Sequence, residues 1–124
     1  MSAWDPAEID TLGVADEVEI TSVREDGSLR PYVTIWAVRS GDDLYVRSAH
    51  GRDNGWFRRA LAAGQGRIRG DGAERDVSFE EPGPEVDDAL HAAFHAKYDQ
   101  YGPQLVDPVV SDESARATFR LVPR

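Results

Sequence analysis

Residues 30–48, RPYVTIWAVRSGDDLYVRS, hold the pattern that decides the fold. From Tyr32 to Val38 the side chains are apolar or nearly so on both faces of an extended chain. Such a strand needs cover on both faces. This pattern therefore predicts a strand at the centre of a barrel or within an interface. Gly41 and the two aspartates after it then turn the chain into a second strand, Leu44–Ser48. The stretch therefore predicts a β-rich domain in which these two strands are central.

The flanking sequence adds four more strands and three helices. Asp26-Gly27 and Asp71-Gly72 mark two hairpins, because Asp-Gly supplies the positive backbone angle that a tight turn needs. The further strands are expected at residues 18–22, 66–70, 73–80 and 115–122, and the helices at residues 5–13, 56–63 and 85–101. Since no β–α–β alternation appears, the predicted fold class is mainly β (α+β), a six-stranded antiparallel split β-barrel with flanking helices.

The longest predicted helix, Glu85–Tyr101, carries a stripe of side chains that recur every three or four residues. This spacing places them on one face, which is the buried face of a helix packed on a sheet. The stripe consists of Val86, Leu90, Ala93, Phe94, Lys97 and Tyr101. A proline-bearing loop is expected after it, over residues 102–108, before the last strand.

Length and composition exclude several classes of protein. The length of 124 residues indicates one domain over residues 1–124, and the absence of cysteine excludes disulfides, thiolate metal sites and iron–sulfur clusters. The net charge of −9 argues against nucleic acid as a partner, because proteins that bind phosphate backbones need a basic surface. No apolar run approaches the roughly 18 residues of a membrane span, and the N-terminus is acidic. A cytoplasmic protein with no membrane partner is expected.

The basic residues gather in one part of this acidic chain. Between Leu44 and Arg75 three acidic residues stand against seven arginines, at positions 47, 52, 58, 59, 67, 69 and 75. High-GC codon usage is one interpretation of the general excess of arginine over the single Lys97. The functional interpretation is a local site for a small anion, because the guanidinium fork matches phosphate and carboxylate.

Other kinds of site have weak support in the sequence. His91 and His95 are four residues apart on the predicted helix, but no third metal ligand follows them, so a solvated helix face is the preferred interpretation. Gly64-Gln65-Gly66 follows a helix rather than a strand and lacks the spacing of a dinucleotide-binding loop. No G-x-S-x-G motif or pair of catalytic carboxylates appears, which gives hydrolase chemistry little support.

The segment between the two central strands and the following helix carries the best candidate. Arg47 and Arg52 bracket the turn Ser48–Gly51, where backbone donors and a hydroxyl would share a phosphate. Trp56 opens the next helix and Trp36 lies in the central strand, so the two rings either flank a flat ligand or belong to the core.

The stretch RPYVTIWAVRSGDDLYVRS, followed by AHGRDNGWFRRALAAGQGRIR and AERDVSFE, resembles the flavin-binding split β-barrel superfamily. It is most similar to the deazaflavin-dependent nitroreductase and quinone reductase branch. The closing features Lys97-Tyr98-x-x-Tyr101-Gly102 and Leu121–Arg124 resemble a small bacterial family usually grouped with those reductases. The resemblance implies a flavin- or deazaflavin-dependent oxidoreductase, with FMN or a deazaflavin as cofactor and a small molecule as substrate.

The resemblance also implies the cofactor-binding residues. The cofactor phosphate would be held by five residues of one loop: Arg47, Ser48, His50, Gly51 and Arg52. Thr34 would lie near the ring, and Trp56 would take the place of the helix-opening aromatic residue. Asn54-Gly55 stands where the branch typically has a proline, and Arg58-Arg59 replaces its usual His-Asn pair.

Two further expectations complete the hypothesis. A non-enzymatic split-barrel module that binds a small anionic ligand, its cofactor lost, stays open as the alternative to an enzyme. A homodimer is expected, because the strand from Tyr32 to Val38 offers more apolar surface than one 124-residue barrel can cover.

Overall fold

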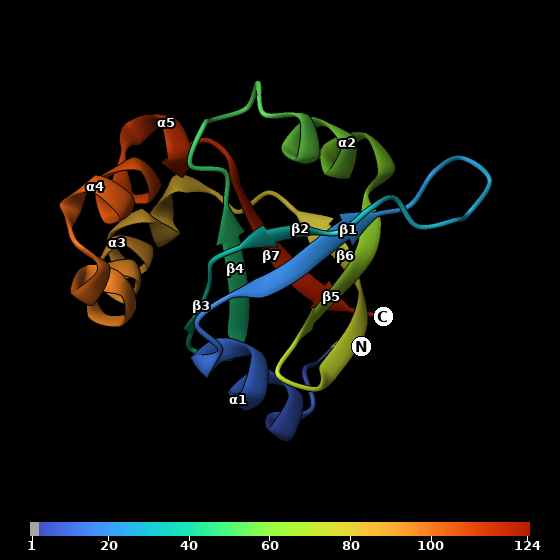
Figure 1. Cartoon of the computed structure of the whole chain (residues 1–124), viewed down its shortest axis with the longest axis horizontal. Coiled ribbons are helices and arrows are strands. Elements are labelled where there is room, and N and C mark those ends of the chain that lie inside the picture. The colour runs from blue at the N-terminus through green and yellow to red at the C-terminus, as the bar shows by residue number, and fades with distance from the viewer. Residues whose placement is uncertain (1–2) are drawn as a thin grey trace.

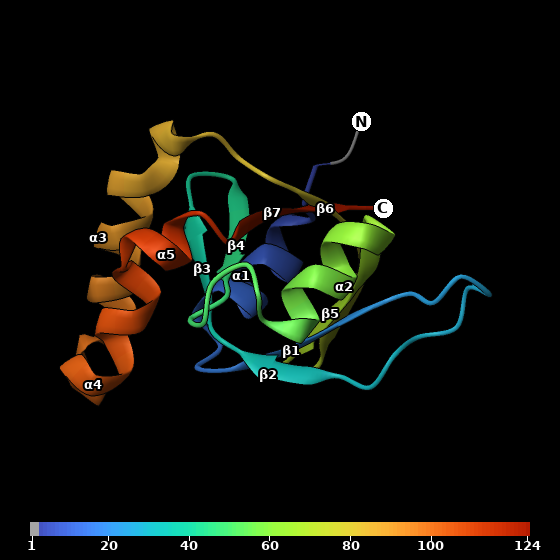
Figure 2. The ribbon, with the colours of Figure 1, turned by 90° about the horizontal axis from the view of Figure 1, so that it is seen from above.

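The computed structural model describes residues 3–124, which form one β-barrel with helices at both ends and along one side (Figures 1 and 2). The strands are β1 (Val18–Ser22), β2 (Val33–Ile35), β3 (Ala37–Ser40), β4 (Asp43–Arg47), β5 (Gln65–Gly70), β6 (Ala73–Glu80) and β7 (Thr118–Pro123). The helices are α1 (Pro6–Val14), α2 (Gly55–Ala63), α3 (Asp87–Tyr98), α4 (Pro103–Val106) and α5 (Asp112–Ala115). Short 3-10 turns cover Pro84–Val86, Asp99–Tyr101 and Asp107–Val110.

The barrel is a single antiparallel sheet with the strand order β2-β1-β5-β6-β7-β4-β3. Its two edge strands, β2 and β3, are separated in the sequence only by Trp36. Because the chain passes directly from one edge to the other, the sheet must curl until the barrel is nearly closed. The mainly β architecture with flanking helices is thus confirmed.

The predicted number of six strands is wrong, since the structure has seven. The expected strand from Tyr32 to Val38 is divided at Trp36, because β2 pairs with β1 while β3 pairs with β4. Side chains of α3 hold the bend between them. The Ala37 amide donates to the Tyr98 hydroxyl at 3.3 Å, and the Lys97 amine donates to the Ala37 carbonyl at 2.7 Å.

Two groups of buried side chains stabilise the molecule. One fills the barrel, where α1 and α2 close opposite ends with residues such as Leu12 and Phe57. The other lies between the outer face of β3 and β4 and helix α3, around Val38 and Phe94. The second group explains why the central strand is apolar on both faces: α3 covers the outer face of Val38.

The buried stripe predicted for residues 85–101 is correct except at its C-terminal end. Leu90 and Phe94 are fully buried, whereas Tyr101 is 40% exposed and Tyr98 is the aromatic residue that packs inward. The helix ends at Tyr98 and a tighter 3-10 turn follows, so Tyr101 is rotated away from the stripe.

The segment before the last strand differs from the expected loop. Residues 103–115 contain two short helices and a 3-10 turn, and β7 begins at Thr118 rather than at residue 115. Proline stands in the first turn of two of these pieces, where its missing amide is not needed. Ser111 caps α5 by accepting a hydrogen bond from the Ser114 amide at 3.1 Å.

Within residues 3–124, no helix combines the length and apolar character that crossing a membrane requires.

Candidate anion-binding site

Arg47, the first predicted phosphate ligand, lies inside the protein. Its side chain is fully buried, and its Nε donates to the Thr118 hydroxyl at 2.9 Å while Nη1 donates to the Val109 carbonyl at 3.0 Å. Nη2 lies 3.4 Å from a carboxylate oxygen of Asp87. Burial lowers the pKa of the guanidinium, and the Asp87 charge opposes that shift. Arg47 therefore joins β4, β7, the 107–110 turn and α3.

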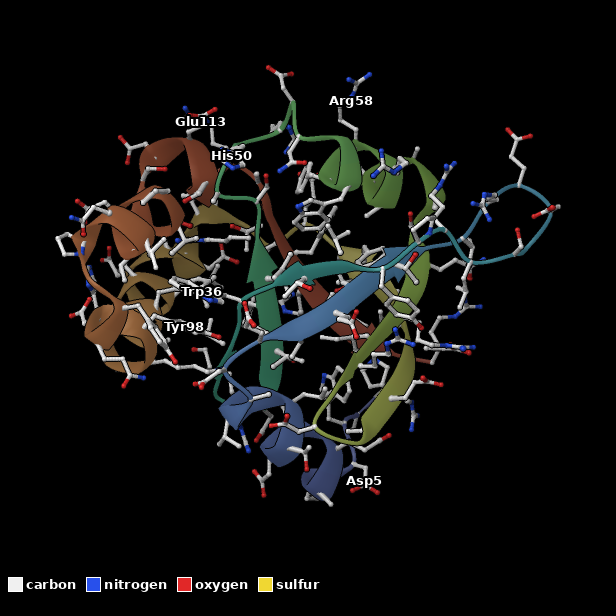
Figure 3. The ribbon with its side chains drawn as sticks, in the orientation of Figure 1. Asp5, Trp36, His50, Arg58, Tyr98 and Glu113 are labelled. Carbon is white, nitrogen blue, oxygen red and sulfur yellow. The ribbon has the colours of Figure 1, made fainter. Side chains whose placement is uncertain are left out.

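Two of the four backbone amides in the predicted phosphate turn after β4 are already bonded. The Ser48 amide donates to the Ala117 carbonyl, and the Gly51 amide donates to the Ser48 carbonyl. The Glu113 side chain of α5 lies against Gly51, beside the exposed His50 (Figure 3). A carboxylate at this place repels a phosphate rather than attracting one. The Ser48 hydroxyl is buried and has no hydrogen-bond partner.

The other predicted residues lie apart from one another. Arg52 is about half exposed, pairs with Glu81 and donates to the Arg116 carbonyl at 2.7 Å. Thr34 is exposed on β2, opposite Glu19 of β1. Trp56 is only 8% exposed and packs in the barrel core, edge-on to Phe119. The structure therefore brings Arg47, Ser48, His50, Gly51 and Arg52 to one end of β4, but neither Thr34 nor the Trp56 ring joins them.

Two further groups with perturbed pKa values serve the bend at Trp36. Burial lowers the pKa of the Lys97 amine to about 8, and burial raises the pKa of the Tyr98 phenol. Both groups bond the backbone of Ala37, and the Tyr98 ring stacks on Trp36 with centroids 4.0 Å apart. These contacts give Trp36 a packing role.

Ion pairs distinguish the thirteen arginines from one another. On the β5–β6 hairpin, register places Arg67 opposite Asp76 and Arg69 opposite Glu74. Seven arginines have a carboxylate within 4.0 Å: 39, 47, 52, 67, 69, 75 and 120. Among residues 3–124, the remaining six have no such partner. Four of these six line one hollow of the surface.

This hollow, which we call the arginine groove, is lined by residues of α2 and of the hairpin of residues 23–30. Its volume is about 710 Å³. Arg24 and Arg30 come from the two ends of the hairpin, and Arg58 and Arg59 come from α2. Glu25 is the single acidic residue in its wall. A protein with a net charge of −9 thus keeps a local excess of positive charge here.

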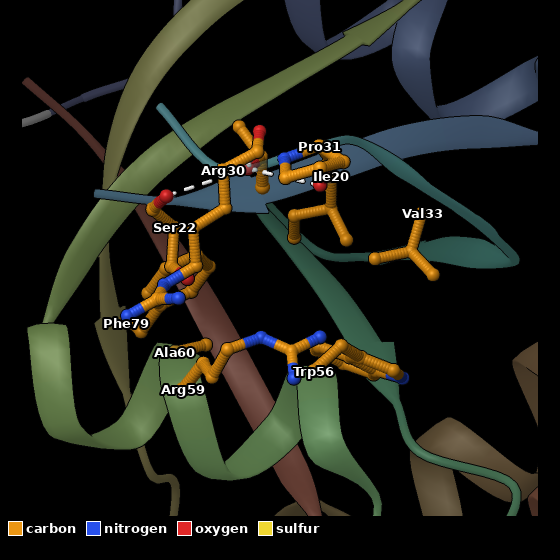
Figure 4. A pocket seen from close by; sticks show the side chains of 10 residues that line it. Ile20, Ser22, Arg30, Pro31, Val33, Trp56, Arg59, Ala60 and Phe79 are labelled. Carbon is orange, nitrogen blue, oxygen red and sulfur yellow. Dashed lines mark hydrogen bonds between the residues drawn. The ribbon is translucent and has the colours of Figure 1, made fainter. Parts of the chain in front are cut away.

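Local contacts position two of the four arginines, Arg30 and Arg59 (Figure 4). The Thr21 hydroxyl donates to the Arg30 carbonyl at 2.6 Å, which fixes the backbone, while the buried Arg30 Nε has no hydrogen-bond partner. Arg59 folds back over Gly55 at the start of α2, so a Cβ on this glycine would lie 2.8 Å from its Nη1. Asn54 makes no side-chain cap there, and the first turn of α2 has no acidic residue.

Next to the groove, a narrow crevice leads toward the barrel core. Arg30 and Arg59 line both spaces, and the aromatic side chains of Trp56 and Phe79 also line the crevice. Its volume is about 10 Å³, which is room for a single water molecule. Within residues 3–124, no cluster of three His, Asp or Glu side chains is arranged to hold a metal ion.

The arginine groove is only partly visible in the local charge of the sequence. The window from Leu44 to Arg75 leaves out Arg24 and Arg30, and it counts hairpin arginines that face acidic residues across the strands. Subtracting those cross-strand pairs removes Arg67 and Arg69 and leaves five candidates, at positions 47, 52, 58, 59 and 75.

Comparison with known proteins places these features in context. The family described as "Uncharacterized protein conserved in bacteria (DUF2255)" matches residues 8–121. No curated protein sequence matches the chain. Among solved structures, a protein described as an F420 reductase is similar with 20% identity and a TM-score of 0.61, over 98% of this chain and 94% of its own.

Two further structures share the fold. A FAD-binding protein from Mesorhizobium loti has 14% identity and a TM-score of 0.57, and the heme storage protein HutZ from Vibrio cholerae has 13% identity and a TM-score of 0.61. Each alignment covers 100% of this chain and 92% of the other. The resemblance to the flavin-binding split-barrel superfamily is thereby confirmed at the level of the fold.

Proposed function

The chain belongs to the DUF2255 family of bacterial proteins, and we propose that it is an oxidoreductase that binds a flavin-type cofactor, FMN, FAD or a deazaflavin, through the arginine groove. The observation that carries the proposal is the groove itself, where four arginines without acidic partners meet on a barrel of this fold. Proteins of similar structure are described as an F420 reductase and a FAD-binding protein. The proposed substrate is a small molecule.

The groove fits the anionic part of such a cofactor. Guanidinium groups bind phosphate with charge-assisted hydrogen bonds of roughly 1.5–3 kcal/mol each. Arg30 and Arg59 would hold the phosphate, because both side chains point into the space between the sheet and α2 (Figure 4). The unpartnered Nε of Arg30 is a buried donor that such a ligand would satisfy.

The crevice, in contrast, does not fit the ring of a flavin. Its volume of about 10 Å³ is far below the roughly 300 Å³ of a small-molecule pocket, because Trp56 and Phe79 fill it. We therefore assign only the anionic tail to the arginine groove. When bound, the cofactor supplies the hydride chemistry, and the protein holds and orients it. Trp56 keeps water out of the barrel core beneath the groove.

A pair of arginine variants tests this assignment against the one predicted from the sequence. Arg30→Ala should weaken FMN binding roughly ten- to a hundredfold, because it removes a charged donor from the groove. Arg52→Ala makes the same charge change in an exposed pair with Glu81 and should leave the affinity unchanged. Fluorescence titration measures both. If binding depended on Arg52 and not on Arg30, the phosphate site would lie at the turn after β4, as the sequence predicts.

The filled crevice favours a second candidate function, a non-enzymatic barrel that binds a small anion. The visible absorbance of the purified protein separates the two functions. If the protein is colourless, thermal unfolding is followed with FMN, FAD, a deazaflavin, heme and inorganic phosphate in separate samples. A ligand at 100 times its Kd adds about 2.7 kcal/mol to the free energy of unfolding. Stabilisation by phosphate but by none of the cofactors would support the non-enzymatic module.

We also propose a homodimer, on a narrower surface than the sequence suggested. Helix α3 covers Val38, whereas Val33 and Ile35 of β2 pack against the barrel core but stay only half-buried, and Thr34 between them is exposed on this edge strand. A second copy would cover this edge. Light scattering at micromolar concentration should give twice the monomer mass of 13.7 kDa. A particle of 13.7 kDa would remove the dimer from the proposal.

A further inference from the structure

We infer that the arginine groove recognises two separate anionic groups of one ligand, so that its natural occupant has a longer anionic tail than FMN. The inference rests on the proposed function for the kind of cofactor, but it concerns the groove alone. The shared chemistry is a phosphate followed by a second anionic group. A diphosphate and a phosphodiester that continues into carboxylates both have this chemistry.

The four arginines divide into two pairs by position. Arg30 and Arg59 form the inner pair, because they line both the groove and the crevice. Arg24 and Arg58 form the rim pair, because they line the groove only. Arg24, Arg58 and Arg59 are exposed and Arg30 is half-buried, and Arg58 extends from α2 toward solvent (Figure 3). An anion held by the inner pair therefore leaves the rim pair unoccupied.

The charge of the groove wall also favours a ligand with two anionic groups. Four guanidinium groups face one carboxylate, Glu25, which leaves an excess of three positive charges in the groove wall. A phosphate monoester carries about −1.5 to −2 at neutral pH and places all of that charge beside one pair of arginines. A ligand with two anionic groups places negative charge beside both pairs. The other acidic residue of the hairpin, Asp26, keeps its negative charge near Arg24 and accepts hydrogen bonds from the Ser28 amide at 3.0 Å and from the Ser28 hydroxyl, but it does not line the groove.

Arg24 is also held in place before any ligand arrives. Its Nη1 donates to the Leu29 carbonyl at 2.8 Å and to the Ser28 hydroxyl at 3.3 Å, across the base of the hairpin. These bonds use one nitrogen and leave the other guanidinium donors free. A donor fixed in this way loses less conformational entropy when an anion binds.

Titration with three cofactors and matched variants tests the inference. We expect FAD or a deazaflavin with a phosphodiester–carboxylate tail to bind at least tenfold more tightly than FMN. Arg24→Ala and Arg58→Ala should each remove most of this difference, because they should weaken binding of the longer cofactors much more than binding of FMN. Arg116→Ala is the control, since Arg116 is an exposed arginine without an acidic partner outside the groove. Equal affinity for FMN and both longer cofactors, or an equal effect of the rim variants on FMN, would overturn the inference.

Ring-free anions keep this outcome separate from that of the proposed function. Calorimetry should show pyrophosphate binding at least tenfold more tightly than phosphate, with the difference lost in Arg24→Ala and Arg58→Ala. If this holds and no flavin binds, the two-anion groove stands while the cofactor proposal fails. If pyrophosphate and phosphate bind equally, or neither binds, the two-anion groove is wrong even where FMN binds.

Discussion

Replacing Phe94 by alanine should lower the free energy of unfolding by about 3–5 kcal/mol, because it leaves a cavity between α3 and the barrel. Phe94 is fully buried in the outer group of apolar residues, where its ring lies 6.2 Å from that of Tyr98. This group is the main attachment of α3 to β3 and β4. Urea unfolding followed by tryptophan fluorescence measures the loss.

Tyr101→Ala is the matched control for Phe94→Ala. Tyr101 is an aromatic residue just beyond the same helix, but it is 40% exposed. Its truncation should cost less than 1 kcal/mol, as exposed substitutions usually do. If Phe94→Ala also cost less than 1 kcal/mol, α3 would not be packed on the barrel as described.

Local patterns predicted most of the fold correctly. The two Asp-Gly turns, the alternating strands and the apolar stripe of α3 depend on neighbouring residues, which a single sequence displays directly. The division of one apolar run into β2 and β3 depends on distant contacts instead. Tyr98 and Lys97 bond Ala37 from about sixty residues away, and no local pattern contains that information.

The short helices of residues 103–115 were missed for a different reason. Each is a single turn, too short for a helical period to appear in the sequence. The prolines of this segment, Pro103 of α4 and Pro108 of the 3-10 turn, indicate a loop when read one at a time, although proline is favoured in a first helical turn. One of these turns, α5, also brings Glu113 against Gly51 and so changes the charge beside the predicted phosphate site.

The candidate site was the least predictable part, because it depends on which arginines remain unpaired. Composition indicated a surplus of arginine near the middle of the chain, but not which side chains would meet a carboxylate. Arg24 and Arg59 are 35 positions apart in the sequence and share one groove only because the hairpin of residues 23–30 lies beside α2. Sequence proximity favoured Arg47 and Arg52, but in the fold Arg47 pairs with Asp87 and Arg52 pairs with Glu81.

Replacing Arg47 by methionine should therefore destabilise the fold by about 3–5 kcal/mol, as expected when one partner of a buried ion pair is removed. The Val109 carbonyl and the Thr118 hydroxyl lose their donor, and Asp87, two-thirds buried, loses its charge partner. Methionine retains much of the packing against Phe94, so the loss reports mainly the polar contacts. Arg52→Ala should cost less than 1 kcal/mol, because its pair with Glu81 is exposed.

The same variant separates a structural arginine from a ligand-binding one. If Arg47 only joins β4, β7 and α3, the folded fraction of Arg47→Met should bind FMN as tightly as the unaltered protein does. Binding is then measured at low temperature, where circular dichroism confirms that the variant is folded. A tenfold weaker affinity together with an unchanged free energy of unfolding would show the opposite role. In that case Arg47 would turn out of the interior to meet the phosphate, and the contacts with Thr118 and Val109 would be too weak to hold it in place.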